Sequence, residues 1–184
     1  MTRACAKTGD TVIVTGAGGG VALFAVQFAV AHGCRVFVTS SSDEKIAFAK
    51  TLGAEGGVRY TEPDWDKQLK SLTGGVDAVV DGAGGEGFAR LSKLMKPGGR
   101  MAFYGGTAGK IPGLSPQVLF WRQVTIAGST MGSPREFGAM LNFVTEHEIR
   151  PVVDSVRPLE ELGDALDRMK GGKQRGKLVL KVKS

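Results

Sequence analysis

Residues 11–27 read TVIVTGAGGGVALFAVQ and place three signals next to one another. The apolar run at residues 11–15 is typical of a strand buried on both faces, as the strands of a parallel sheet are. An apolar stretch of helical length begins a few residues later. Between the two lies a turn that contains Gly16, Gly18, Gly19 and Gly20. A strand, a glycine-rich turn and a helix in this order predict the first unit of an open α/β sheet.

The same turn predicts a binding site for an anion. The first N–H groups of a helix lack intrahelical partners and lie at the positive end of the helix dipole, so they favour a pyrophosphate. The best frame is Gly16-x-x-Gly19-x-x-Ala22, which departs from the strict GxGxxG pattern. Ala22 is still small enough for the helix to pack closely on the sheet. We therefore expect a dinucleotide to contact the glycines of the turn and the following Val21.

Apolar runs alternate with amphipathic stretches along the rest of the chain. Further strands are expected at residues 35–39, 58–60, 76–81, 100–104 and 124–127. Helices are expected at residues 19–32, 42–52, 64–72, 86–95 and 134–148. This alternation predicts an α/β fold in residues 1–150, a doubly wound parallel sheet of about six strands. A helix at 159–170 and an alternating strand at 177–183 form a C-terminal tail, residues 151–184.

Glycine accounts for 28 of the 184 residues, roughly twice its average share. One group precedes the expected strands and is explained by helix ends and turns. A second group follows the strands, and in a parallel sheet those strand ends share the edge at which open α/β sheets bind ligands. We expect this edge to hold a nicotinamide ring through Gly82, Ala83, Gly105, Gly106, Thr107, Ser129 and Thr130.

The end of the second expected strand distinguishes between NAD(H) and NADP(H). An NAD site usually has Asp or Glu about twenty residues beyond the glycines, where it accepts the ribose hydroxyls. Here that region reads Thr39-Ser40-Ser41-Ser42 and contains no acid. The acids that follow belong to an expected capping box, Ser41-x-x-Glu44, at a helix start. Lys45 can pair with a 2′-phosphate beside the serine hydroxyls, so the sequence favours NADP(H) over NAD(H).

The charge of the chain is unevenly distributed. The net charge is +6, but residues 168–184 hold seven basic residues and no acid, which leaves the remainder near neutral. We interpret this basic end as a solvated surface rather than a nucleic-acid site. No stretch approaches the roughly 20 apolar residues of a membrane span. Two isolated cysteines and two isolated histidines do not offer the ligands of a zinc site, and the unpaired thiols favour a reducing cytoplasm.

Six segments occur in the order of a known family: GDTVIVTGAGGGVALFAVQFA, VTSSSDEKIAFAKTLGA, LTGGVDAVVDGAGG, MKPGGRMAFYGGTAG, FWRQVTIAGSTMGSPREF and PLEELGDALDRMKGGKQRGKLVLKV. Together they resemble the cofactor-binding half of medium-chain dehydrogenases/reductases, in the branch of zinc-binding dehydrogenases and quinone oxidoreductases. The resemblance implies an NADPH-dependent oxidoreductase that transfers hydride between nicotinamide and a quinone, an enal or enone, or an alcohol or carbonyl compound. In NADP-using members a lysine and a tyrosine contact the 2′-phosphate, and these match Lys45 and Tyr60.

The resemblance also implies what this chain lacks. Family members carry a GroES-like catalytic domain that supplies the substrate wall and any zinc ligands, and we expect it to be absent here. The tail would then have lost its packing partner, and the chain itself would hold neither zinc nor a catalytic residue. Asp77 and Asp81 are interpreted as strand and turn residues. The last sheet strand pairs across a dimer in the family, which implies a homodimer through the segment from Gln123 to Gly128.

Two other classes of enzyme that use a similar sheet lack their characteristic residues in this sequence. A short-chain dehydrogenase would need Tyr-x-x-x-Lys, which neither Tyr60 nor Tyr104 begins. A methyltransferase on the same sheet would need an acid at the end of the second strand. A truncated nucleotide-binding module without turnover, which serves as a sensor, scaffold or dimerisation unit, stays open as the alternative.

Overall fold

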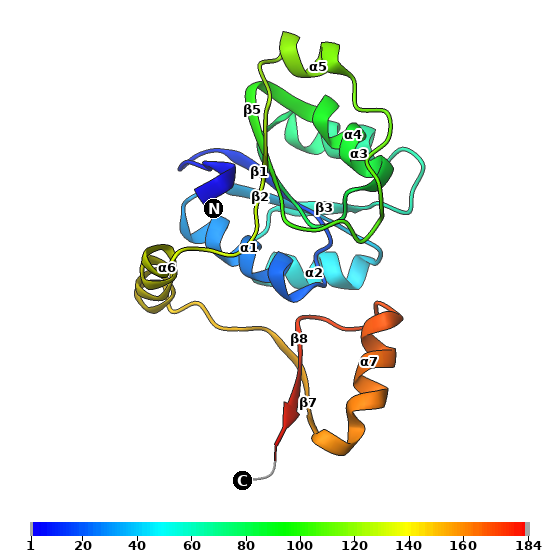
Figure 1. Ribbon diagram of the computed structural model, residues 1–184. Helices are drawn as coiled ribbons and strands as arrows, with labels where there is room; N and C mark the ends of the chain where they lie inside the picture. The colour runs from blue at the N-terminus through cyan, green and yellow to red at the C-terminus, as the bar shows by residue number, and fades with distance from the viewer. Residues whose placement is uncertain (1, 183–184) are drawn as a thin grey trace.

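Six parallel strands form one sheet in the order β3-β2-β1-β4-β5-β6 in the computed structural model, which describes residues 2–182 (Figure 1). The strand order reverses beside β1, because the chain returns from β3 at one edge to β4 on the other side of β1. A crevice at such a reversal is where open α/β sheets bind ligands. The strands are β1 Thr11–Val14, β2 Arg35–Ser40, β3 Gly56–Arg59, β4 Val76–Asp81, β5 Met95–Phe103 and β6 Thr125–Gly128.

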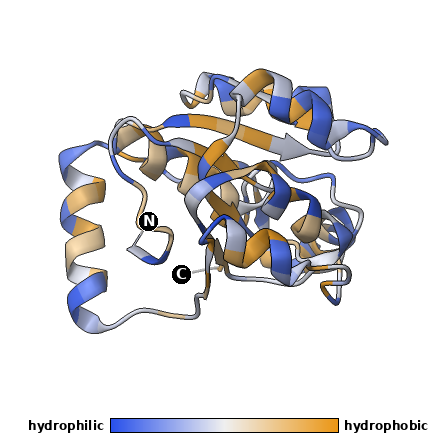
Figure 2. Cartoon of the chain, turned by 90° about the horizontal axis from the view of Figure 1, so that it is seen from above, coloured by the Kyte–Doolittle hydropathy of each residue, from blue (hydrophilic) through white to orange (hydrophobic). Residues whose placement is uncertain are grey.

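Alternate residues of the strands face two separate cores, because successive side chains of a strand point to opposite faces. Val12 and Val14 pack with Ala22 on the face that α1 (Gly20–Ala31) and α2 (Asp43–Thr51) cover. Ile13 packs instead with Phe88 on the face that α3 (Trp65–Thr73) and α4 (Gly85–Leu94) cover. Apolar side chains on both faces of the strands confirm the doubly wound α/β fold, and orange stretches run through the strands in Figure 2. The helices of this unit are α1 Gly20–Ala31, α2 Asp43–Thr51, α3 Trp65–Thr73, α4 Gly85–Leu94, α5 Pro116–Trp121 and α6 Pro134–Glu146, preceded by a short 3-10 turn, η1 Thr2–Ala4.

Helix α6 lies outside both cores, and none of its residues is buried. It begins with a capping box in which the Ser133 hydroxyl accepts from the Glu136 N–H at 3.2 Å and the Glu136 carboxylate accepts from the Ser133 N–H at 2.8 Å. Its Phe143 ring contacts His32 at the end of α1, with the ring centroids 4.6 Å apart. One side of α6 therefore contacts α1 while the rest of its surface is open.

The tail forms a smaller unit of its own. Its two strands, β7 Val153–Pro158 and β8 Lys177–Lys181, pair in parallel, and α7 Leu162–Lys170 connects them after the short turn η2 Leu159–Glu161. Figure 1 shows this unit projecting from the main sheet. Many of its apolar side chains, such as Val156, Leu166 and Met169, are exposed. An isolated two-stranded sheet is marginally stable by itself, so the contacts of the tail with the main unit matter.

The structure differs from the sequence-based expectation in a few elements. β5 begins at Met95 rather than at residue 100, because Met95 pairs with Val76 before a bulge in the register. Helix α5 and strand β7 were not expected, since six residues are too few to display a helical period and β7 mixes polar with apolar residues. The expected strand at 177–183 ends at Lys181, and residue 183 lies outside the described part of the chain.

Candidate dinucleotide-binding site

The glycine-rich turn is tightly folded between β1 and α1. Gly16 has a φ of +70°, a left-handed conformation that side chains disfavour, and its carbonyl accepts from the N–H groups of Gly18 at 2.7 Å and Gly19 at 3.0 Å. The Ala17 N–H donates to the Thr39 carbonyl at 2.9 Å, which ties the turn to the end of β2. No acidic residue lies in the first turn of α1. The N–H groups there can therefore face an anion.

Two lysine side chains lie over this turn. A Cβ added to Gly18 would stand 2.8 Å from Cδ of Lys45, and one added to Gly20 would stand 2.5 Å from Cε of Lys177. Lys45 belongs to α2, and Lys177 is the first residue of β8 in the tail. A Cβ at either position would push aside the flexible end of a lysine side chain, so glycine lets both cations lie directly against the turn. Sequence reasoning missed Lys177, because we interpreted the basic end of the chain as a solvated surface.

The tail reaches the turn through its backbone. The Gly176 N–H donates to the Gly18 carbonyl at 2.9 Å, and the Lys45 ammonium donates to the Gly172 carbonyl at 2.5 Å. These bonds join residues more than 120 positions apart in the sequence, so no local pattern could indicate them.

The residues expected to distinguish NADP(H) from NAD(H) gather at the ends of β2 and β3. Thr39 and Ser40 are buried, and the Tyr60 N–H donates to the Ser40 carbonyl at 3.0 Å, so that Tyr60 follows β3 directly beside the end of β2. Its side chain is half-exposed. Ser41 is exposed between this strand end and α2. No carboxylate stands at the end of β2.

The expected capping box at Ser41 is wrong by one residue. The N-cap of α2 is Ser42, whose hydroxyl accepts from the Lys45 N–H at 3.2 Å. The helix begins at Asp43, one position later than the box requires, so the third residue of the helix is Lys45 instead of Glu44. The cap thus fixes the backbone of Lys45, while its ammonium group lies outside the cap and bonds the Gly172 carbonyl.

A buried carboxylate holds the loop after β4. Asp81 is almost fully buried and accepts from the Thr15 hydroxyl at 2.7 Å and from the Gly84 N–H at 2.8 Å. The Gly82 N–H donates to the same Thr15 hydroxyl at 3.1 Å. Every partner of this carboxylate belongs to a strand end or a turn, which agrees with the interpretation of Asp81 as a structural residue.

The loops after β4 and β5 pack backbone against backbone. The Ala108 N–H donates to the Ala83 carbonyl at 2.8 Å, and the Thr107 hydroxyl lies 3.5 Å from the Gly82 carbonyl. A Cβ on Gly105 would come within 2.6 Å of the same Gly82 oxygen. The close approach of the two loops therefore depends on glycine at position 105.

A groove of about 640 Å³ opens beside these loops, and its lining includes Gly105, Gly106, Ser129 and Thr130. A second groove of about 750 Å³ continues along α1 and α6, and Val21 lines it. Tyr104, the first residue after β5, lines both grooves and is a site residue that the sequence analysis missed. The only available signal was its position, directly after an apolar strand and before two glycines.

Burial raises the pKa of the Tyr104 phenol, and the nearby Asp81 carboxylate raises it further. Its ring faces Gly82, where an added Cβ would stand 2.6 Å from the phenol oxygen. Tyr104 therefore stays protonated at neutral pH and presents a hydroxyl between the two grooves.

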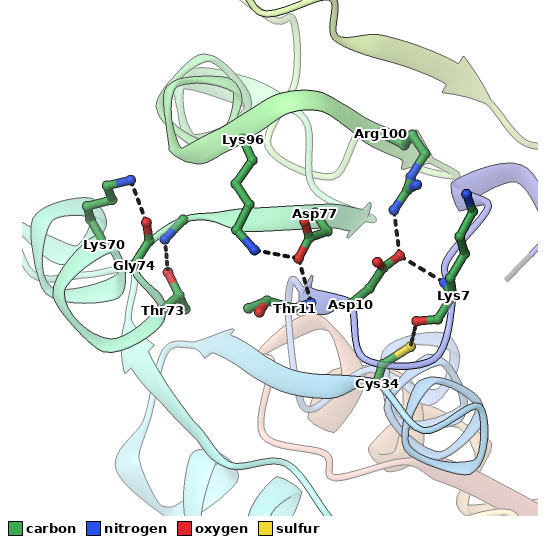
Figure 3. Close-up of polar contacts among 11 residues, drawn as sticks. Lys7, Asp10, Thr11, Cys34, Lys70, Thr73, Gly74, Asp77, Lys96 and Arg100 are labelled. Atoms are coloured by element: carbon green, nitrogen blue, oxygen red, sulfur yellow. Dashed lines mark hydrogen bonds and ion pairs between the residues drawn. The ribbon is translucent and has the colours of Figure 1, made fainter.

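Ion pairs occupy the opposite edge of the sheet, at the amino ends of the strands (Figure 3). The Asp77 carboxylate accepts from the Thr11 N–H at 2.9 Å and pairs with Lys96 at 2.7 Å, while Asp10 pairs with Arg100 at 2.5 Å. Asp77 is thus engaged far from the glycine-rich turn, which fits its interpretation as a strand residue.

Residues 2–182 contain no group of three or more His, Cys, Asp or Glu side chains that could hold a metal ion. These residues do not fit a zinc site, and no zinc ligand is assigned to them. None of the helices between residues 2 and 182 has the length and apolar character to cross a membrane.

A six-stranded parallel sheet with a glycine-rich turn at its reversal point defines a Rossmann-type nucleotide-binding domain. The family model of zinc-binding dehydrogenases matches residues 20–146. The chain belongs to this family and corresponds to the cofactor-binding half of a medium-chain dehydrogenase/reductase.

Individual relatives support the same assignment. The chain is 43% identical to the zinc-type alcohol dehydrogenase-like protein YogA of Leptosphaeria maculans over 96% of its own length and 52% of that protein. It superposes on an NAD-dependent alcohol dehydrogenase with a TM-score of 0.91 and 39% identity, over 99% of this chain and 54% of that one. A quinone oxidoreductase of Thermus thermophilus, solved also with NADPH, gives a TM-score of 0.82 at 30% identity, over 98% and 60% of the two chains. The chain thus spans about half the length of the curated relatives it matches.

Proposed function

We propose that this chain is the NADP(H)-binding domain of an oxidoreductase that transfers hydride between nicotinamide and a quinone, an enal or enone, or an alcohol or carbonyl compound. The observation that carries the proposal is the pair of cations over the glycine-rich turn, Lys45 and Lys177, combined with the lack of a carboxylate at the end of β2. A carboxylate there would repel a 2′-phosphate, whereas Lys45 attracts one.

The parts of the site have different tasks. The bound cofactor supplies the hydride chemistry. The N–H groups at the start of α1 and the Lys177 ammonium bind the pyrophosphate, while Ser41, Lys45 and Tyr60 bind the 2′-phosphate beside Thr39 and Ser40. The loops after β4, β5 and β6 orient the nicotinamide through Gly82, Ala83, Gly105, Gly106, Thr107, Ser129 and Thr130, with Val21 on its other side. None of these residues is assigned a proton-transfer role.

Cofactor preference tests the proposal directly. We expect the chain to bind NADPH more tightly than NADH, as measured by calorimetric titration or quenching of tryptophan fluorescence. Lys45→Ala removes a hydrogen bond between charged groups, worth about 1.5–3 kcal/mol, and is expected to weaken NADPH by roughly tenfold or more without a matching loss for NADH. Lys50→Ala, at the other end of α2, is the control. Equal losses for both cofactors would refute the assignment of Lys45.

Catalysis by the chain itself is the second part of the test. We propose that residues 1–150 are the nucleotide-binding unit and that residues 151–184 belong structurally to a GroES-like catalytic domain. The observation behind this division is the separate sheet of the tail and its exposed apolar side chains. NADPH oxidation with a panel of quinones and enals measures turnover. Binding without turnover would favour the alternative, a nucleotide-binding module that serves as a sensor, scaffold or dimerisation unit.

We also propose a cytoplasmic homodimer formed through the segment from Gln123 to Gly128. β6 is the last strand of the sheet, and an open strand edge favours pairing with a second chain. Phe120 and Trp121 on the neighbouring α5 expose 59% and 78% of their surface. Cys5 and Cys34 are free thiols, which suits a reducing compartment. A monomer by light scattering at working concentration would contradict the dimer.

A further inference from the structure

Arg175 of the tail lies against the first turns of α2. Its guanidinium carbon is 4.3 Å from the centroid of the Phe48 ring, and its Nη1 is 3.7 Å from a carboxylate oxygen of Glu44. Lys45 is the neighbour of Glu44 on the same helix, and its ammonium group bonds the carbonyl of Gly172 in the same tail turn. Two cations from distant parts of the sequence thus flank one region at the start of α2.

The backbone of this tail turn is firmly held. The Arg175 N–H donates to Oδ1 of Asp154 at 2.9 Å, and Arg168 binds both oxygens of Asp154 at 2.8 and 3.0 Å. The Asp154 side chain is only 7% exposed. One residue further on, Gly176 bonds the glycine-rich turn. The position of Arg175 is therefore set by its neighbours rather than by its own ion pair.

The ion pair of Arg175 is weak and leaves the guanidinium available. At 3.7 Å, and with the Glu44 side chain 84% exposed, the pair is screened by water and contributes little. The Arg175 side chain is itself 43% exposed. A guanidinium offers a planar fork of donors that matches a phosphate better than an ammonium does. The Phe48 ring beneath restricts its motion, which lowers the entropy lost on binding.

We propose that Arg175 is a second specificity-determining residue for the 2′-phosphate. The tail places Arg175 at the site, opposite Lys45. The proposal rests on the preference for NADP(H) given above. It makes the recognition of the 2′-phosphate depend on both units of the chain.

The test compares 2′,5′-ADP with 5′-ADP, because the two ligands differ only in where the second phosphate is attached. Each is titrated calorimetrically into the full chain. Arg175→Gln is expected to weaken 2′,5′-ADP about tenfold and to leave 5′-ADP within about twofold. Arg175→Lys keeps the charge but not the planar fork of donors. Its affinity for 2′,5′-ADP is expected to lie between those of the wild type and Arg175→Gln. Lys181→Gln removes the same charge from an exposed position of β8 and is the matched control.

Each outcome is decisive. An equal loss of affinity for both ligands in Arg175→Gln would mean that Arg175 only holds the tail in position, and it would overturn the proposal. An unchanged preference for 2′,5′-ADP in that variant would overturn it as well, while leaving the preference for NADP(H) intact. A wild-type chain that binds the two ligands equally would overturn both this inference and that preference.

Discussion

The substitution Gly105→Ala tests the close approach of the two loops at the nicotinamide end. Its Cβ would stand 2.6 Å from the Gly82 carbonyl oxygen, whereas an ordinary contact between carbon and oxygen is about 3.3 Å. One loop must therefore move by roughly 0.7 Å. Both atoms belong to backbone or to a Cβ, so no flexible side chain can absorb the shift. Overpacking of this kind costs about 1–3 kcal/mol.

The adjacent Gly106→Ala is a matched control, because a Cβ at that position meets no atom within 4 Å. Both variants share the gain of about 0.4–1 kcal/mol that alanine brings by restricting the unfolded chain, so their difference isolates the contact. For a chain of this size we expect Gly105→Ala to melt roughly 2–12 °C below Gly106→Ala in circular dichroism. It should also bind NADPH more weakly. Equal melting temperatures for the two variants would refute the reasoning.

Three further outcomes are expected. Asp154→Asn should destabilise the tail by about 1–3 kcal/mol. The hydrogen bond from Arg168 is the main cause that lowers the Asp154 pKa. The difference in unfolding free energy between the wild type and Asp154→Asn should therefore be present above about pH 4 and disappear as the pH falls through the lowered pKa. Urea unfolding at several pH values measures it. The Tyr104 phenol, identified by the absorbance that Tyr104→Phe removes, should titrate above pH 10 in the wild type. The stability that this raised pKa contributes should decline as the pH rises beyond about 10. Titration of this phenol below pH 10 would contradict its burial. Phe88→Ala should cost about 3–5 kcal/mol in urea unfolding, since Phe88 is fully buried, and a cost under 1 kcal/mol would contradict its place in the core.

The sheet was predictable because its signals are local. Thr11–Val14 is buried at every position, so burial on both faces leaves a continuous apolar run in the sequence. The glycine-rich turn was likewise predictable, because a residue with a positive φ, such as Gly16, is usually glycine and so leaves a mark in the sequence. Helix α5 and strand β7 lacked such signals. The former is short and the latter is half-exposed, so neither imposes a clear period on its residues.

The candidate site was predictable only in part, for a related reason. Lys45 and Tyr60 follow strand ends, and the topology of a parallel sheet brings strand ends together. Lys177, by contrast, reaches the glycine-rich turn from the far end of the chain, and Tyr104 lies over Gly82 because of loop packing. Contacts of that kind depend on three-dimensional placement rather than on spacing.

The sequence by itself determined the parallel α/β sheet, the glycine-rich turn and the family, since each leaves a pattern in short runs of neighbouring residues. Only the tertiary structure decided that the basic end of the chain returns to that turn. Hydrogen bonds of Gly18 with Gly176 and of Lys45 with Gly172 hold the tail there. The acceptors of these bonds are backbone carbonyls, which every residue carries, so the sequence does not indicate which carbonyls will accept them.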